Sequence, residues 1–169
     1  ACLVGSEMCI RDRYEQLVNS EFVEQAGHRR IIGYASNTSS HSIEINYADS
    51  VQQELTFCVP THGAAPEKAN EIATTDLALK ALGVEPEIGA EVPLEFELRG
   101  KTYHYDMVLS GWWEASNDSV SVATVSEQFI KENPDVVQNT YAVDHEMSGV
   151  TFSDVVLKNK ANVQQQLNE

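Results

Sequence analysis

The sequence predicts an α+β fold with mixed, mainly antiparallel sheets and short helices. Several short segments alternate apolar and polar residues, which is the period-two pattern of strands. Glycine, proline and asparagine separate these segments at short intervals, as in hairpins. Strand and helix patterns do not alternate regularly along the chain, and this irregular order favours α+β over a doubly wound parallel sheet.

The first third of the chain predicts one short helix and two strands. Tyr14–Ser20 is expected to form the helix, and His28–Ala35 and His41–Ala48 the strands, with turn residues at Asn37–Ser40 between them. The second strand has the clearer alternation and is expected to be half-buried. Its apolar residues are Ile43, Ile45 and Tyr47, and its polar residues are Ser42, Glu44 and Asn46.

A loop and a capped helix follow. Val59–Lys68 contains two prolines and a glycine and is expected to be a loop, with a short strand at Glu71–Ala73. Thr74 or Thr75 can cap a helix, and Gly83 stands where a left-handed C-terminal cap is needed. The apolar positions of this helix are Leu77, Leu79, Ala81 and Leu82.

The clearest hairpin joins Glu91–Leu98 to Thr102–Gly111 through a turn at Arg99–Lys101. Pro93 predicts that the first strand lies at an edge or begins there. One face of the hairpin is apolar, with Val92, Leu94, Phe96, Leu98, Tyr103, Tyr105, Met107 and Leu109. Glu91, Glu95 and Glu97 lie on the other face, which we interpret as a solvated strand face rather than a pair of catalytic acids.

The last third predicts a strand at Val120–Val125 and a helix from its cap Ser126 to Ile130, which Pro134 stops. Another strand is expected at Val150–Leu157 and the start of a helix at Ala161–Glu169. Around Asn139–Ser148 the composition becomes polar, which marks a candidate seam between two subdomains.

The first residues are not expected to be native. Translated back into codons, Cys2–Asp12 resembles a transposase-type sequencing adapter, so we exclude Ala1–Arg13 from the fold. The remaining residues 14–169 suit one domain and can bury a substantial core. Cys58 is then the only native cysteine, and this excludes an intrachain disulfide or a cysteine-rich metal site.

Charge and motifs exclude several function classes. The net charge of −15 disfavours binding to nucleic acid and to anionic lipid headgroups. The nucleotide-binding patterns G-x-x-x-x-G-K-[ST] and G-x-G-x-x-G and the hydrolase pattern G-x-S-x-G are absent. No histidine has metal-ligand spacing, and Asp144, His145 and Glu146 are consecutive, so they cannot converge from a regular strand. We therefore predict no catalytic, cofactor or metal residues.

Other candidate residues have plain structural interpretations. His62 is expected to be an ordinary loop histidine and His104 to face solvent. Cys58, between Phe57 and Val59, is expected to be a buried and inert thiol. Trp112 and Trp113 should point to opposite faces, so at most one of them enters the core. Whether the other marks an interface or a ligand platform stays open. Asn37 and Asn117 begin sequon triplets, which carry little weight alone.

Four short motifs occur in a recognisable order. They are PEKANEIA at Pro66–Ala73, LxLxxLGV at Leu77–Val84, IGAxVxL at Ile88–Leu94 and LSGWW at Leu109–Trp113. Their order and spacing resemble the extracytoplasmic, MacB-type core domain of FtsX-like ABC transporter permeases. Ile45–Asp49 and Gly149–Asn159 also resemble the version found in bacterial permeases with large outer loops.

The resemblance implies a non-catalytic extracytoplasmic domain of a dimeric permease in the cell membrane. Membrane helices are then expected before Tyr14 and after Glu169, and through them the domain would be coupled to an ABC ATPase. The partner outside the membrane would be a protein or a lipid or peptide substrate. No cofactor is implied.

Two alternatives remain open on the residues. One is a free-standing secreted or surface binding module that uses Trp112 or Trp113 and the acidic faces to hold a cationic or carbohydrate ligand. The other is a hydrolase that uses Cys58 or the Asp144–Glu146 cluster.

Overall fold

A computed structural model of the chain describes Gln16, Asn19 and residues 21–98, 100–116, 120–136 and 153–159. It confirms the α+β class. The strands are β1 (Val23–Tyr34), β2 (Ser42–Ala48), β3 (His62–Gly63), β4 (Glu71–Thr75), β5 (Glu91–Leu98), β6 (Lys101–Trp113), β7 (Val120–Val125) and β8 (Ser153–Asn159). The helices are α2 (Ser50–Leu55), α3 (Asp76–Ala81) and α4 (Glu127–Glu132).

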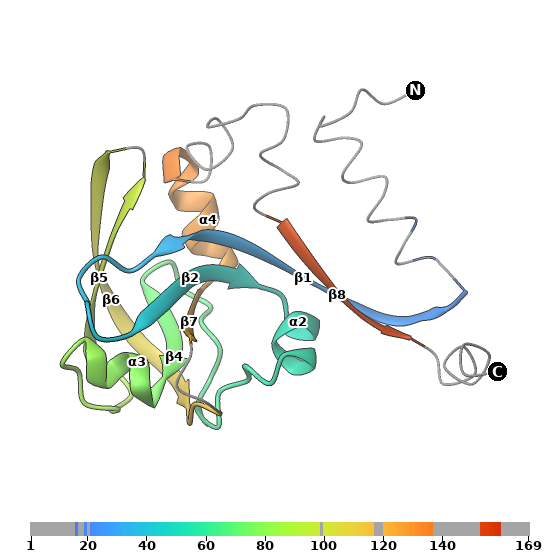
Figure 1. The fold of residues 1–169 in the computed structure, drawn as a ribbon, viewed down its shortest axis with the longest axis horizontal. Coiled ribbons are helices and arrows are strands. Elements are labelled where there is room, and N and C mark those ends of the chain that lie inside the picture. The colour runs from blue at the N-terminus through green and yellow to red at the C-terminus, as the bar shows by residue number, and fades with distance from the viewer. Residues whose placement is uncertain are drawn as a thin grey trace.

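All these strands belong to one mixed sheet (Figure 1). Their order is β3-β6-β4-β7-β2-β1-β8, and β5 pairs with the same edge of β6 as β3. The pairs β2–β7 and β4–β6 are parallel, whereas β1–β2, β1–β8, β3–β6, β4–β7 and β5–β6 are antiparallel. The prediction of a mixed, mainly antiparallel sheet is therefore confirmed for the described residues.

The two ends of this sheet meet. Just after β1, Ala35 forms a bridge with Phe96 of β5, and the Ser36 amide donates to the Glu95 carbonyl at 2.7 Å. The strands β5, β6, β4, β7, β2 and β1 consequently close into a ring. Closure of this kind removes most of the exposed strand edge.

One hydrophobic core fills the ring. Its largest fully buried side chains include Ile32, Ile43, Ile72, Leu94 and Phe96, each no more than 1% exposed. Leu79 of α3 and Phe129 of α4 join the same cluster, and in Figure 1 these two helices lie at opposite ends of the body. The apolar face predicted for the β5–β6 hairpin is the face that packs into this core.

The predicted helix caps are present. Thr75 caps α3 by accepting a hydrogen bond from the Ala78 amide at 3.1 Å, and Ser126 caps α4 by accepting from the Phe129 amide at 3.0 Å. Gly83 has the expected left-handed backbone, with φ of 73°. None of the helices in the described part of the chain is long and apolar enough to cross a membrane.

The polar face of β2 is covered rather than solvated, which corrects the half-buried interpretation. Glu44 and Asn46 are only 6% and 2% exposed. Glu44 accepts two hydrogen bonds of 3.1 Å from Arg29 and one of 2.8 Å from Asn46, whose own carbonyl accepts from Thr124. These contacts make burial of a carboxylate tolerable, because each oxygen has a donor.

Helix α2, which the sequence patterns did not predict, packs against β1 and β8. Asp49 caps it by accepting from the Gln52 amide at 2.8 Å, and its second carboxylate oxygen accepts from the His28 amide of β1 at 3.1 Å. Asp49 thus fixes α2 to the middle of β1.

The first half of β1 and all of β8 form a two-stranded arm that leaves the body (Figure 1). Val23 pairs with Asn159 at its outer end and Arg30 with Ser153 at its base. The predicted strands there, His28–Ala35 and Val150–Leu157, are correct in type but displaced by several residues. Tyr14–Ser20, Asn139–Ser148 and Ala161–Glu169 fall wholly or mostly outside the described residues, so their predictions stay untested.

Candidate functional site

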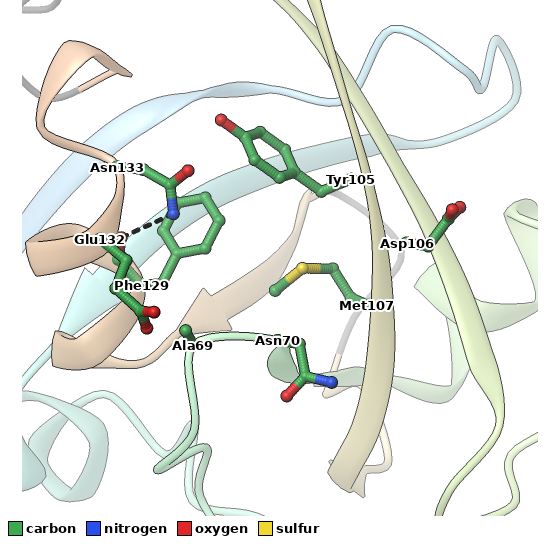
Figure 2. A pocket seen from close by; sticks show the side chains of 8 residues that line it. All are labelled: Ala69, Asn70, Tyr105, Asp106, Met107, Phe129, Glu132 and Asn133. Atoms are coloured by element: carbon green, nitrogen blue, oxygen red, sulfur yellow. Dashed lines mark hydrogen bonds between the residues drawn. The ribbon is translucent and has the colours of Figure 1, made fainter.

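A shallow pocket opens between the β5–β6 hairpin, α4 and the loop before β4 (Figure 2). Its volume is about 270 Å³. Tyr105 and Met107 of β6 and Phe129 of α4 point into it, and Glu132 and Asn133 lie at the end of α4. Ala69, Asn70 and Asp106 complete the lining.

The floor of this pocket is aromatic and apolar. Met107 and Phe129 are each 1% exposed. The Tyr105 ring meets the Phe129 ring edge to face, with 5.1 Å between centroids, and stacks at 6.1 Å against Phe96. Burial, followed by the nearby Tyr103 and Asp135, raises the pKa of Tyr105 above its ordinary value of 10.0. The phenol is therefore neutral and available as a hydrogen-bond donor at physiological pH.

The polar groups of the pocket lie around its rim. Asn133 uses its amide nitrogen to donate to the Phe129 carbonyl at 2.9 Å, which closes the last turn of α4. The Asp106 carboxylate points away from the floor and lies 3.0 Å from Nε2 of His104 (Figure 2). Glu132 places a carboxylate on the α4 side of the rim.

This arrangement can bind a small group. The residues that line the pocket include no serine, cysteine or histidine. Among the described residues, no cluster of three histidine, cysteine or acidic side chains could hold a metal ion. A small apolar or amphipathic group is what an aromatic floor with a polar rim accommodates.

A second candidate, the tryptophan pair, lies at the far end of β6. Trp113 is 5% exposed, and Trp112 is half-buried and packs against the main core cluster. His62 stacks on Trp112 with 3.9 Å between ring centroids and an interplanar angle of 9°. His62 is thus a packing partner of Trp112, and it covers part of the surface that a ligand platform would need.

The loop that carries His62 is held tightly to β6. The Thr61 amide donates to the Trp112 carbonyl at 3.1 Å, and the Ala64 amide to the Ser110 carbonyl at 2.9 Å. At Gly111 a Cβ atom would collide with the Ala64 carbonyl oxygen and lie 2.8 Å from Cβ of Pro60, so the approach requires glycine. This end of β6 is closed by main-chain contacts.

Cys58 is less enclosed than predicted. Its neighbours Phe57 and Val59 are 87% and 44% exposed, and Phe57 has a left-handed backbone with φ of 59°. The apolar side chains beside Cys58 therefore do not bury it, and the thiol is half-buried. Burial still raises its pKa, which leaves little thiolate at neutral pH. The prediction of a buried thiol was therefore wrong in its degree of burial.

The other predicted residues lie where expected or outside the described part of the chain. His104 and Glu97 face solvent on the outer face of the hairpin. The Asn37 side chain is exposed and donates to the Pro93 carbonyl at 2.9 Å. The Asp144–Glu146 cluster, His145 with it, and the Asn117 sequon fall outside the described residues.

Sequence reasoning did not find the pocket. Its residues come from three segments that carry no shared motif, and the strand pattern places Tyr105 and Met107 on an apolar face without indicating a pocket. The one available signal was the length of the predicted strand Thr102–Gly111, which exceeds that of its neighbour Glu71–Ala73. A strand that extends beyond its neighbour has an unpaired edge, and a pocket can form beside it.

Comparison with known proteins gives a fold relationship. No family model matches the chain, and no curated protein matches it in sequence. The structure matches the extracellular domain of the noncanonic ABC-type transporter YknZ from Gram-positive bacteria, with a TM-score of 0.55 and 12% identity. The match covers 92% of this chain and 75% of that chain.

A second match is the periplasmic region of MacB from Actinobacillus actinomycetemcomitans. It has 11% identity and a TM-score of 0.36, and it covers 94% of this chain and 82% of that one. The fold assignment rests on the first match. The chain has the fold of the extracellular domain of an ABC-type transporter, as the resemblance of its ordered motifs implies.

Proposed function

We propose that this chain is a non-catalytic extracytoplasmic domain of a bacterial ABC transporter permease. In this proposal residues 14–169 form the domain and Ala1–Arg13 are not native. The domain transmits motion driven by a cytoplasmic ATPase to an exported substrate or to a partner outside the membrane. The observation that carries the proposal is the fold shared with the extracellular domain of YknZ over 92% of the chain.

The arm of β1 and β8 supports this proposal. Val23 lies opposite Asn159, so both ends of the fold leave the body side by side. A domain inserted between two membrane helices of one permease needs its two ends close together. The full-length protein would then lie in the cell membrane, with this domain on the outer side and the ATPase reached through the membrane part.

The base of the arm has the contacts that such a coupling requires. β1 continues without interruption from the arm into the ring. Arg29 joins it to Glu44 of β2, and Asp49 joins it to the cap of α2. A displacement of the arm is therefore passed to the body through an ion pair, a helix cap and the β1–β2 ladder rather than through a flexible linker.

The uninterrupted gene tests the proposal. We expect an apolar segment of about 20 residues upstream of Tyr14 and several more beyond Glu169. A reading frame that ends near Glu169 and encodes no membrane helix would overturn it. That result would favour a free-standing secreted or surface binding module instead.

A further inference from the structure

We propose that the free edge of β6 over Thr102–Asp106, together with the pocket beside it, binds an extended basic peptide of a partner protein. The peptide would add a strand next to β6, place an apolar side chain in the pocket and direct lysine or arginine side chains outward. This interaction surface does not depend on the transporter assignment. It follows from which main-chain groups β6 leaves without a neighbour.

β6 is longer than β4, the strand that pairs with it on the edge opposite β5. β4 accompanies it only from Val108 to Trp113, and the last contact is the Val108 amide donating to the Asn70 carbonyl at 2.7 Å. Before Asn70 the chain turns away, and Glu71 holds this turn by accepting hydrogen bonds from the Glu67 and Lys68 amides. From Lys101 to Met107, β6 therefore has β5 on one edge and no other described strand on the second edge.

The alternating direction of backbone amides along a strand shows which main-chain groups of β6 lack a partner. The Leu109 amide donates to Ala90 on the β5 side, whereas the Val108 amide points to the β4 side. Successive amides alternate, so Thr102, His104 and Asp106 present their N–H and C=O groups on the free edge. No backbone hydrogen bond to a described residue uses these groups. They span about 13 Å, which is enough to pair with four or five residues of an extended peptide.

The outer edge of β5 differs, because it is blocked. Pro93 lacks an amide hydrogen, its carbonyl accepts from Asn37, and the Glu95 carbonyl accepts from Ser36. Proline and covering loops are usual protections of an exposed strand edge. The free edge of β6 has no proline over Thr102–Asp106, and no described strand pairs with it there.

The pocket determines which peptide fits. A peptide strand that extends the line of β4 would point every second side chain toward Tyr105, Met107 and Phe129. The pocket has a volume of about 270 Å³, which is enough for one apolar side chain. The ionisable groups at the rim are Asp106 and Glu132, and Asp135 lies close enough to influence Tyr105. No lysine or arginine lines the pocket. Charge complementarity therefore selects a basic peptide and disfavours an acidic one.

The test uses the full chain and an acetylated, amidated octapeptide of alternating valine and lysine. Hydrogen exchange of individual amides is followed by NMR with and without the peptide. We expect the His104 and Asp106 amides to exchange rapidly in the free chain and at least tenfold more slowly with peptide. The Tyr105 and Met107 amides, which already face β5, should not change.

Two variants separate main-chain pairing from charge. Asp106→Pro removes an edge-facing amide and should weaken peptide binding about tenfold, while Asp106→Asn keeps that amide and should weaken it only about twofold to threefold. Glu91→Pro is the matched control, because it places the same ring and the same loss of charge on the outer edge of β5. It should bind the peptide like the unchanged chain.

The peptide supplies tests that need no protein variant. Methylation of alternate peptide nitrogens on the pairing side should abolish binding, and methylation on the opposite side should leave it intact. The proposal is overturned if the two methylated peptides bind alike, if a valine–glutamate octapeptide binds as well as the lysine one, or if the His104 and Asp106 amides are already slow to exchange in the free chain. The last result would mean that the chain covers this edge itself.

Discussion

β2 and β5 have nearly the same residue pattern but opposite surroundings. Both alternate apolar residues with acidic or polar ones, and both turn the apolar side into the core. The polar side of β2 is covered, so Glu44 is 6% exposed and bound to Arg29 and Asn46. The polar side of β5 is open, so the Glu95 side chain is 39% exposed and its nearest ion-pair partner, His104, is 3.8 Å away.

The difference between these strands comes from the strands beside them. On the polar side of β2, Arg29 of β1 donates to Glu44, and Thr124 of β7 donates to Asn46. After β2, Asp49 starts α2 at once, and the helix folds back against the neighbouring β1. After β5, a tight turn at Gly100 leads straight into β6, and no helix covers the outer face within the described residues. The same alternation therefore gives a buried polar cluster in one case and a solvated surface in the other. Substitutions on the two strands should differ accordingly.

Glu44→Ala should have the largest effect. It removes the acceptor of two Arg29 hydrogen bonds and leaves the guanidinium in a largely buried position. Breaking a fully buried pair in this way costs about 3–5 kcal/mol. The 27% exposure of the Arg29 side chain places the expected loss below that range, at about 2–3 kcal/mol. Urea denaturation measures it. A loss below about 0.5 kcal/mol would show that the polar groups of β2 do not form a buried network.

Asp49→Ala should have the next largest effect, because Asp49 joins the start of α2 to β1, the strand beside β2. The carboxylate accepts from the Gln52 amide and from the His28 amide, so its loss leaves two donors unsatisfied. We expect a loss of about 1–2 kcal/mol in the free energy of unfolding. Asp49→Asn retains an acceptor and should recover most of this loss. Equal destabilisation by both variants would contradict a capping role.

The reactivity of Cys58 measures how well the segment after α2 is buried. Burial raises its pKa above the ordinary 9.0, so the thiolate fraction at pH 8.5 is smaller than that of a free thiol. In a Cys2→Ser, Cys9→Ser background, iodoacetamide should alkylate Cys58 several-fold more slowly than it alkylates glutathione. Asp49→Ala should raise the rate. If Cys58 reacts as fast as glutathione in the Cys2→Ser, Cys9→Ser background without Asp49→Ala, the thiol is not protected by burial.

The raised pKa of Cys58 also determines how the free energy of unfolding changes with pH. The folded chain keeps the Cys58 proton at pH values where the unfolded chain has released it, so folding becomes less favourable as the pH rises above 9. Tyr105 acts in the same direction above pH 10, since its pKa is also raised. Alkaline urea titrations should therefore show stability falling through this range, and Cys58→Ala should make the fall near pH 9 shallower.

Glu95→Ala should have the smallest effect. The side chain is partly exposed, and exposed ion pairs contribute little because water and salt screen them. We expect a change within about 0.5 kcal/mol, measured by the same denaturation series as Glu44→Ala. A loss comparable to that of Glu44→Ala would remove the distinction between the two strands.

Sequence patterns were sufficient wherever neighbouring residues determine the structure. Thr75, Gly83 and Ser126 act within one helical turn, and each has the predicted role. The β5–β6 hairpin needs only a turn and two matching alternations, and these determine its register from Glu91 opposite Val108 to Leu98 opposite Lys101.

The rest depends on pairs that are distant in the sequence. The outer part of β1 has no clear alternation, and its partner β8 lies at the other end of the chain. The burial of Glu44 depends on Arg29 of β1, and the burial of Asn46 depends on Thr124 of β7. The pocket likewise needs α4 beside β6. Local propensity carries no information on such contacts, so they became visible only in the assembled sheet.

The ring and the arm share one strand, and this has a mechanical consequence. β1 begins in the arm, and the residues just after it close the ring through the Ala35–Phe96 bridge and the hydrogen bonds from Ser36 to Glu95 and from Asn37 to Pro93. Tension applied along β1 would shear its hydrogen-bond ladder with β2, where many bonds share the load. The contacts that join the end of β1 to β5 are few, so each of them would carry more of the load. The seam between β1 and β5 is therefore the part of the ring that would open first.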